Sequence, residues 1–291
     1  MKHGDALVVV PAKNEAARIG GVVARSRELG FSVLVVSDGS VDDTVSVARK
    51  FGAAVLENDA SEGLSVSVGR GVAYARDNAY KAVITIDGDG QHDPETLGDF
   101  FEALCSHKIV LGTRFGGLTR GIPTQKLAVN SLGANLVSQI TGQRCLDPSC
   151  GMRGFHISRY REFWTAASSY EYVFNTLFDA LGSPNEMAWC HVPAIYHPNV
   201  PMFTRSAEIL ALISAAVQSA GRWSSFLKTI KDKVTSGKHF KVSVGGDEYF
   251  CFYLFGYDGY LIQCEWSLCQ FEFTVSRDRC VLVSEMKLEE K

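Results

Sequence analysis

The stretch Ala82-Val-Ile-Thr-Ile-Asp-Gly-Asp-Gly-Gln-His-Asp-Pro-Glu95 joins an apolar segment to an acidic turn. The apolar segment is rich in β-branched residues, which is typical of a strand buried on both faces of a sheet. Glycines then alternate with aspartates, and glycine lets the backbone turn sharply. The stretch therefore predicts a central strand with carboxylates gathered at its carboxyl end.

The turn of this stretch is a candidate metal site. Asp87, Asp89 and Gln91 offer oxygen ligands, which suit Mg²⁺ or Mn²⁺ better than zinc. Such ions are usually held by a few carboxylates together with the phosphates of a substrate. The alternative interpretation is a solvated Asx-type turn before a helix that starts near Pro94.

Short apolar strands alternate with helices before and after this stretch. The predicted strands are 6–10, 32–36, 53–56, 82–86 and 108–112, and the predicted helices are 16–29, 45–51, 63–75 and 96–104. Gly30 and Gly52 end helices, while Gly63, Gly69 and Gly71 allow close approach of the helix that contains them. This alternation predicts an α/β domain with a mainly parallel sheet flanked by helices.

Polar clusters follow three of the predicted strands, at 11–15, 37–43 and 87–93. Ligands of such sheets bind beyond the carboxyl ends of the strands. We therefore expect the clusters to line one pocket that holds a nucleotide and its phosphates beside a metal. In the second cluster, Ser40 followed by Asp43 predicts a helix N-cap with an acidic first turn.

The composition is that of an ordinary globular protein, with 291 residues, 46% of them apolar and 21% charged. The net charge of -3 disfavours a general affinity for nucleic acid, although it does not exclude a local basic patch. The 8 cysteines include no C-x-x-C pair, and no signal peptide is evident, so we expect reduced thiols and a cytoplasmic protein. No apolar run reaches the about 18 residues of a membrane helix.

Several segments of the chain match one known pattern in order and spacing. They are Val8-Val-Val-Pro-Ala-Lys-Asn-Glu15, Val35-Val-Ser-Asp-Gly-Ser-Val-Asp-Asp-Thr44, Ile86-Asp-Gly-Asp-Gly-Gln-His-Asp-Pro-Glu95, Leu111-Gly-Thr-Arg-Phe115, Asp147-Pro-Ser-Cys-Gly-Met-Arg-Gly-Phe155 and His191-Val-Pro-Ala-Ile-Tyr196. Together they resemble the family-2 glycosyltransferases with a GT-A fold, over about residues 5 to 230. The third segment is most similar to the dolichol- or polyprenyl-phosphate sugar transferase branch, where D-x-D-x-Q-H-x-P-E is typical.

The resemblance implies a nucleotide-sugar donor, linked to UDP or GDP. The residues that it places around the donor are Pro11, Asn14, Glu15, Asp38, Ser40, Asp87, Gly88 and Arg205. Asp38 would accept a hydrogen bond from the imide N–H of uracil or guanine, because a carboxylate is an acceptor. Helix capping is the alternative role for Glu15 and Asp38. The implied metal, Mg²⁺ or Mn²⁺, would be held by Asp87, Asp89 and Gln91 and would offset charge on the leaving nucleotide.

The resemblance also implies a polyprenyl phosphate as acceptor, and one displacement with inversion at the anomeric carbon. The catalytic residues that it implies are Asp89, Arg114, Lys126 and Asp147. Arg114 and Arg205 would clamp phosphate oxygens, and Lys126 would bind the acceptor phosphate as a point charge. A hydroxyl acceptor would need a general base, whereas a lipid phosphate is already anionic. The candidate bases are Asp93, Asp147 and Glu171.

The C-terminal part changes from a helical to an alternating pattern. Segments 206–217 and 223–234 predict helices, and the second is amphipathic, suited to packing on the catalytic domain or to docking on a membrane surface. Beyond them, alternation with period two predicts an antiparallel meander of about five strands. We expect a catalytic domain at 1–235 and an appendage at 238–291, which packs on that domain or on the other subunit of a homodimer.

Three other functions stay open at this level. The same chemistry could act on a soluble acceptor, such as a glycan, a metabolite or a hydroxylated base in DNA. A sugar-phosphate nucleotidyltransferase has a similar nucleotide-binding layout, but the sequence lacks a Gly-rich run with the Arg and Lys that a triphosphate would demand. A non-catalytic nucleotide-sugar-binding protein is disfavoured by the intact acidic turn.

Overall fold

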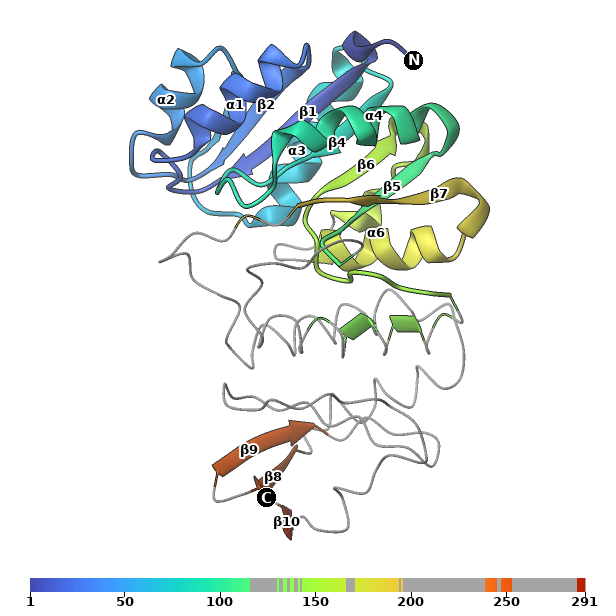
Figure 1. The fold of residues 1–291 in the computed structure, drawn as a ribbon. Coiled ribbons are helices and arrows are strands. Elements are labelled where there is room, and N and C mark those ends of the chain that lie inside the picture. Colours follow the sequence, from blue (N-terminus) through green and yellow to red (C-terminus); the bar gives the residue numbers. More distant parts are fainter. Residues whose placement is uncertain are drawn as a thin grey trace. The chain divides into compact units, whose positions relative to one another are not determined.

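The computed structural model contains a seven-stranded sheet that is mixed but mostly parallel (Figure 1). The structure describes residues 1–115, 130, 133–134, 137–138, 141, 143–165, 171–193, 195, 239–244, 247–252 and 287–290. The chain divides into two compact units, one of Met1–Gly121 with Ser149–Asn199 and one of Ile122–Pro148 with Val200–Lys291. The seven-stranded sheet belongs to the first unit.

The predicted alternation of strands and helices up to residue 112 is confirmed, with ends displaced by a few residues. The strands of the large sheet are β1 (Ala6–Ala12), β2 (Ser32–Asp38), β3 (Ala54–Asn58), β4 (Ala82–Thr85), β5 (Ile109–Thr113), β6 (Arg153–His156) and β7 (Met187–His191). The described α-helices are α1 (Ile19–Glu28), α2 (Thr44–Lys50), α3 (Leu64–Asp77), α4 (Leu97–Ser106) and α6 (Glu171–Leu181). Short 3₁₀ helices are η1 (His3–Asp5), η2 (Pro94–Thr96), η3 (Ile157–Arg159), η4 (Glu162–Trp164) and η5 (Pro184–Glu186).

The strand order is β3-β2-β1-β4-β6-β5-β7. β1 runs parallel to both β2 and β4, so that Leu7 lies opposite Ser32 and Val83. β6 runs antiparallel to both of its neighbours, β4 and β5, and β7 is parallel to β5. The large sheet is therefore the mainly parallel one that the sequence predicts, with one inserted antiparallel strand that the sequence pattern did not show.

Helices cover both faces of this sheet (Figure 1). On one face, Val8 and Val10 of β1 share a core cluster with Ile19 of α1 and with residues of α2 and α4. On the other face, α3 lies against β1, and α3 in turn contacts α6. A Cβ atom on Gly71 of α3 would lie 2.4 Å from Val9 Cγ1. The close approach predicted for Gly71 is therefore confirmed.

The helix ends differ from the prediction at one site residue. Gly30 and Gly52 follow α1 and α2 with φ angles of 88° and 89°, as helix stops. Ser40, however, is not the N-cap of α2, so that prediction is wrong. The helix begins at Thr44, whose N–H donates to Asp42 Oδ1 at 3.0 Å. The N-cap is Asp43, whose side chain makes no capping hydrogen bond, and the first turn of α2 contains no acidic residue, so the predicted acidic first turn is wrong as well.

The second unit contains a small antiparallel sheet. Its strands are β8 (His239–Val244), β9 (Asp247–Phe252) and β10 (Lys287–Glu290), in the order β10-β8-β9. The antiparallel pairing predicted for this part of the chain is confirmed for β8 and β9. β10 also pairs antiparallel with β8, but it begins one residue after the last predicted strand, 280–286. The predicted helices at 206–217 and 223–234 and the remaining predicted strands lie outside the described residues. The domain boundary near 235 and the homodimer stay predictions. Within the described ranges, no helix has the length and apolarity needed to cross a bilayer.

Candidate active site

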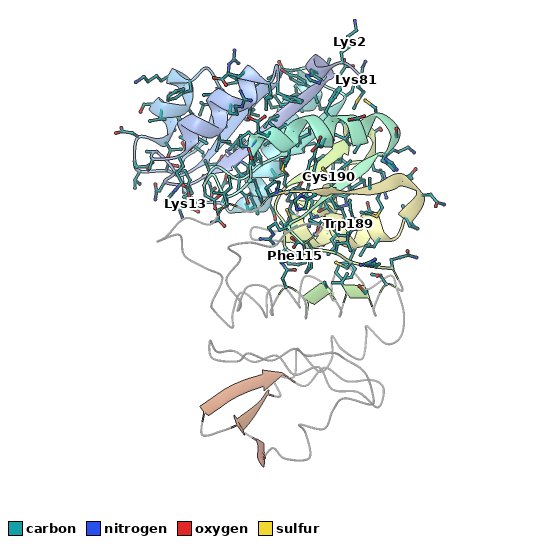
Figure 2. All side chains as sticks on the ribbon, in the orientation of Figure 1. Lys2, Lys13, Lys81, Phe115, Trp189 and Cys190 are labelled. Atoms are coloured by element: carbon teal, nitrogen blue, oxygen red, sulfur yellow. The ribbon has the colours of Figure 1, made fainter. Side chains whose placement is uncertain are left out.

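The carboxyl ends of β1, β2 and β4 lie at one edge of the sheet. Lys13 follows β1 at this edge, while Lys2 and Lys81 lie at the opposite end of the strands (Figure 2). The turn after β4 packs closely on the end of β1, because a Cβ atom on Gly88 would lie 3.4 Å from the Pro11 carbonyl oxygen. The first and third predicted polar clusters therefore meet.

Hydrogen bonds join the first cluster to the second. The Asn14 N–H donates to Ser40 Oγ at 3.1 Å, and Asn14 Oδ1 accepts from the Val41 N–H at 2.9 Å. The Glu15 N–H donates to Thr44 Oγ1 at 2.7 Å. Asn14 adopts a left-handed φ of 57°, which asparagine tolerates better than most residues. The structure thus brings all three predicted clusters to one edge of the sheet.

Both carboxylate oxygens of Asp38 accept hydrogen bonds from the end of β3 and from the loop between β3 and α3. Oδ1 accepts from Asn58 Nδ2 at 3.0 Å and from the Glu62 N–H at 2.7 Å. Oδ2 accepts from Ser61 Oγ at 2.8 Å and from the Gly63 N–H at 3.0 Å. Burial alone would raise the pKa of Asp38, but these donors outweigh it, and the pKa is lowered. Asp38 therefore holds the loop between β3 and α3, and its predicted contact with a base stays a prediction.

Replacing Asp38 by asparagine is expected to destabilise the protein by about 2–4 kcal/mol, because an NH₂ group would then face hydrogen-bond donors. Since the folded pKa of Asp38 is lowered, the carboxylate stabilises fully above its unfolded pKa of about 4. That stabilisation is lost as the pH falls through the folded value. In urea unfolding, the difference between wild type and Asp38→Asn should shrink below about pH 4. A pH-independent difference would contradict the assignment.

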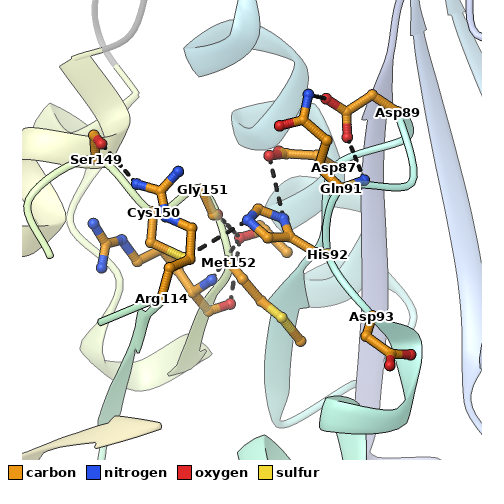
Figure 3. Close-up of polar contacts among 12 residues, drawn as sticks. Asp87, Asp89, Gln91, His92, Asp93, Arg114, Ser149, Cys150, Gly151 and Met152 are labelled. Carbon is orange, nitrogen blue, oxygen red and sulfur yellow. Dashed lines mark hydrogen bonds and ion pairs between the residues drawn. The ribbon is translucent and has the colours of Figure 1, made fainter. Parts of the chain in front are cut away.

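The turn after β4 is folded around Asp89. The Gln91 N–H donates to Asp89 Oδ1 at 2.9 Å, and Gln91 Nε2 donates to Asp89 Oδ2 at 2.8 Å (Figure 3). Gly90 between them has a φ of 70°, which permits the tight turn. The segment after β7 also reaches this turn, because the Ile195 N–H donates to the Gln91 carbonyl oxygen at 3.0 Å. Two sequence motifs distant in the chain thus converge here.

Asp87 is surrounded by residues that the sequence analysis did not assign to the site. His92 Nδ1 lies 3.2 Å from Asp87 Oδ2, and His92 Nε2 lies 3.7 Å from Cys150 Sγ (Figure 3). A Cβ atom on Gly151 would lie 2.8 Å from both oxygens of Asp87. His92 belongs to the motif at 86–95, and Cys150 and Gly151 belong to the motif at 147–155. Membership in these motifs was the sequence signal that could have pointed to them, since no spacing rule connects them to Asp87.

The donor atoms at this edge fit a hard divalent cation. The pKa of Glu15 is raised, mainly by burial and then by the negative charge of Asp89. The contribution of Asp89 shows that Glu15 and Asp89 are close enough for their negative charges to repel. Carboxylate and amide oxygens of Asp87, Asp89 and Gln91 are ligands that Mg²⁺ and Mn²⁺ accept. In the part of the chain that the structure describes, no three His, Cys, Asp or Glu side chains form a closed metal site. Mg²⁺ is usually held by one or two carboxylates together with substrate phosphates, and the acidic turn offers such carboxylates.

The other predicted catalytic residues are spread over both units. Arg114, 8% exposed, follows β5 and donates from Nη2 to Ser149 Oγ at 2.8 Å. Its guanidinium carbon lies 5.6 Å from the ring centre of Phe115. Asp147 belongs to the second unit, where its Oδ1 accepts from Asn130 Nδ2 at 2.9 Å. The predicted site residues that lie outside the described ranges are Lys126 and Arg205.

Sequence comparison shows what the chain is similar to. The family model described as glycosyl transferase family 2 matches residues 7–165. The dolichyl-phosphate hexose transferase of Haloferax volcanii is 32% identical over 154 residues, which cover 52% of this chain and 66% of that protein. The polyprenol monophosphomannose synthase of Mycolicibacterium smegmatis is 26% identical over 160 residues, which cover 51% of this chain and 60% of that protein. The matched region thus spans less than two thirds of either relative.

Comparison with solved structures concerns the fold. Glucosyl-3-phosphoglycerate synthase from Mycobacterium tuberculosis, crystallised with UDP, superposes with a TM-score of 0.58 at 21% identity. The match covers 74% of this chain and 80% of that one. This likeness confirms the predicted GT-A-like α/β fold. Because the family model spans residues 7–165 of 291, the chain belongs to glycosyl transferase family 2 and is a glycosyltransferase that moves a sugar from a nucleotide sugar.

Proposed function

We propose that the protein moves a hexose from a UDP- or GDP-sugar to a polyprenyl phosphate, with inversion at the anomeric carbon. The observation that carries this proposal is the meeting of three polar clusters beyond β1, β2 and β4. In open α/β sheets this edge is where nucleotides bind. The proposed donor-binding residues are Pro11, Asn14, Glu15, Asp38, Ser40, Asp87, Gly88 and Arg205.

The acidic turn supports a metal-dependent donor site. Asp87, Asp89 and Gln91 would hold Mg²⁺ or Mn²⁺, which when bound supplies positive charge beside the diphosphate. The structurally similar glucosyl-3-phosphoglycerate synthase has been crystallised with Mn²⁺ and UDP, which supports the same pairing in this chain. Two hydrogen bonds from Gln91 to Asp89 hold the turn together.

The relatives with named acceptors support a lipid phosphate. Their names are dolichyl-phosphate hexose transferase and polyprenol monophosphomannose synthase. Two of the carboxylates considered as general bases already accept hydrogen bonds within the chain. Asp93 Oδ1 accepts from the Glu95 N–H at 3.0 Å, and Asp147 accepts from Asn130. A phosphate acceptor needs no base, so this use of the carboxylates agrees with an anionic acceptor.

The proposed reaction is a single displacement. A phosphate oxygen of the acceptor forms a bond to the anomeric carbon as the bond from that carbon to the donor diphosphate breaks. The bonding electron pair leaves with the nucleoside diphosphate, and no proton has to be removed from the acceptor. Arg114 is proposed to bind phosphate oxygens and Lys126 the acceptor phosphate, since a guanidinium and an ammonium both pair with phosphate.

Donor binding can be tested by thermal shift with UDP, GDP, CDP and dTDP, each with and without Mn²⁺. Ligand that binds only the native state raises Tm by mass action, about 2.7 kcal/mol of stabilisation at a hundredfold excess over Kd. We expect a Mn²⁺-dependent rise with UDP or GDP. If no nucleotide raises Tm in the presence of Mn²⁺, the proposed function is wrong.

Acceptor identity is tested with the donor found in that panel. Transfer of labelled sugar to a polyprenyl phosphate in detergent is compared with transfer to the matching polyprenol, which lacks the phosphate. We expect product only from the phosphate. Transfer to the polyprenol would show that the acceptor group is a hydroxyl and not a phosphate. Transfer to neither lipid but to a soluble phosphorylated metabolite would show that the acceptor is not a lipid.

A further inference from the structure

His92 lies between a proposed metal ligand and a buried thiol. His92 is 3% exposed, and Cys150 is fully buried. The ring reaches Asp87 Oδ2 through Nδ1 at 3.2 Å and Cys150 Sγ through Nε2 at 3.7 Å (Figure 3). The imidazole therefore links the turn after β4 to the segment before β6 through both of its nitrogens.

The chemistry of the two neighbours determines where the ring hydrogen lies. A carboxylate offers only acceptors, so the tautomer with the hydrogen on Nδ1, which lies 3.2 Å from Asp87 Oδ2, suits this side of the ring. Nε2 then presents a lone pair, and the Cys150 thiol is a weak donor that can meet it. This tautomer matches the chemistry of both neighbours. The other tautomer would set a lone pair of Nδ1 against the carboxylate.

Two glycines fix the positions of the carboxylate and the thiol. Asp87 lies against Gly151, where a Cβ atom would be 2.8 Å from each carboxylate oxygen. Cys150 lies against Gly112 of β5, where a Cβ atom would be 2.6 Å from Sγ. Neither Asp87 nor Cys150 can move toward these backbones. The two groups that flank His92 are therefore each packed against a glycine.

We propose that His92 is a positioning residue that orients Asp87 toward the metal and the donor diphosphate, and that Cys150 selects the tautomer of His92. The inference rests on the proposed function and adds to it residues that touch neither metal nor substrate. In metal sites, partners that orient a ligand in this way typically change metal affinity or activity by about 10–100-fold. The effect expected here is of that size.

The test measures Mn²⁺ binding by the full chain in the presence of saturating UDP or GDP. Binding is detected as loss of the electron paramagnetic resonance signal of free Mn²⁺. His92→Phe removes both ring nitrogens, and His92→Asn keeps an N–H donor near the position of Nδ1. His156→Phe is the matched control. His156 is half-buried, its Nε2 bonds the Leu104 carbonyl oxygen at 2.8 Å, and it pairs with Ala82 at the amino end of β4.

We expect His92→Phe to weaken Mn²⁺ binding by about 10–100-fold, and His92→Asn to stay within about threefold of wild type. His156→Phe should lower Tm without changing Mn²⁺ affinity. If His92→Phe is folded and binds Mn²⁺ as wild type does, the inference is wrong while the proposed function stands. If His92→Phe does not fold, the test passes to His92→Asn, which keeps the N–H donor. Weak Mn²⁺ binding by folded His92→Asn would then show that the inference is wrong. If wild type itself binds no Mn²⁺ with either nucleotide, the proposed function fails, and the inference fails with it.

The role of the thiol has its own pair of variants. Cys150→Ala removes the donor to Nε2, and Cys190→Ala removes another buried cysteine of the same core cluster. We expect a several-fold weaker Mn²⁺ affinity for Cys150→Ala and an unchanged affinity for Cys190→Ala. Equal affinities in the two variants would remove Cys150 from the positioning role.

Discussion

Asp89→Asn should lower kcat/KM for sugar transfer by about 10³-fold, the largest effect of any single substitution in the proposed site. Both carboxylate oxygens of Asp89 accept from Gln91, through its N–H and through Nε2. An amide at this position would turn an NH₂ group toward one of those donors, so the turn would lose a hydrogen bond. It would also lose one negative charge that a divalent cation requires nearby.

The measurement is the initial rate of transfer over a range of Mn²⁺ concentrations, with Asp77→Asn as the control. Asp77 is exposed and ends α3, away from the carboxyl edge of the sheet, so its neutralisation should leave the rate unchanged. Loss of activity in both variants would point to net charge instead of the turn. Activity of Asp89→Asn near that of wild type would exclude Asp89 from the reaction.

Gly151→Ala should lower kcat/KM by about 10²-fold or more while leaving the fold intact. The added methyl would lie 2.8 Å from both oxygens of Asp87, so the carboxylate would have to shift from its position beside His92. Misplacement of a reacting geometry by about 1 Å can cost about 10²-fold in rate. The cost in stability should be no more than about 1–3 kcal/mol, as for other overpacked sites. Rate and Tm are therefore measured together.

Gly21→Ala is the matched glycine control. Gly21 lies in α1, and a Cβ atom there would meet nothing within 4 Å. Alanine in a helix is favoured over glycine by up to about 1 kcal/mol, so this variant should gain Tm and keep full activity. A Gly151→Ala enzyme with wild-type activity would show that Asp87 can work from another orientation, which would also weaken the role of His92.

The sheet was predictable wherever its strands carry their own signal. β1, β2 and β4 are continuous apolar runs, because both of their faces are covered by helices. β6 reads Arg-Gly-Phe-His, and Arg153 within it is fully buried, so neither alternation nor hydrophobicity marks it. It is a strand because β4 and β5 offer it two edges at once. That is a tertiary cause, which a local pattern cannot express.

The site divides in a similar way. The three clusters were predictable because parallel strands bring their carboxyl ends to one edge. The partners of individual side chains were not, since they come from far along the chain. Asp38 meets a loop 20 to 25 residues away, and His92 meets Cys150 at a separation of 58 residues. Sequence thus located the acidic turn but gave no means to foresee what holds its carboxylates in place.

The insertion of β6 between β4 and β5 also sets the order in which the nascent chain can complete its sheet. The first four strands can pair once β4 has left the ribosome, but the other edge of β4 then has no partner. Its partner Arg153 follows Thr85 by 68 residues. At a synthesis rate of roughly 5–20 residues per second, that edge stays open for several seconds. An unpaired edge is a template for foreign strands, so each newly made chain passes through a period in which aggregation competes with completion of the donor site.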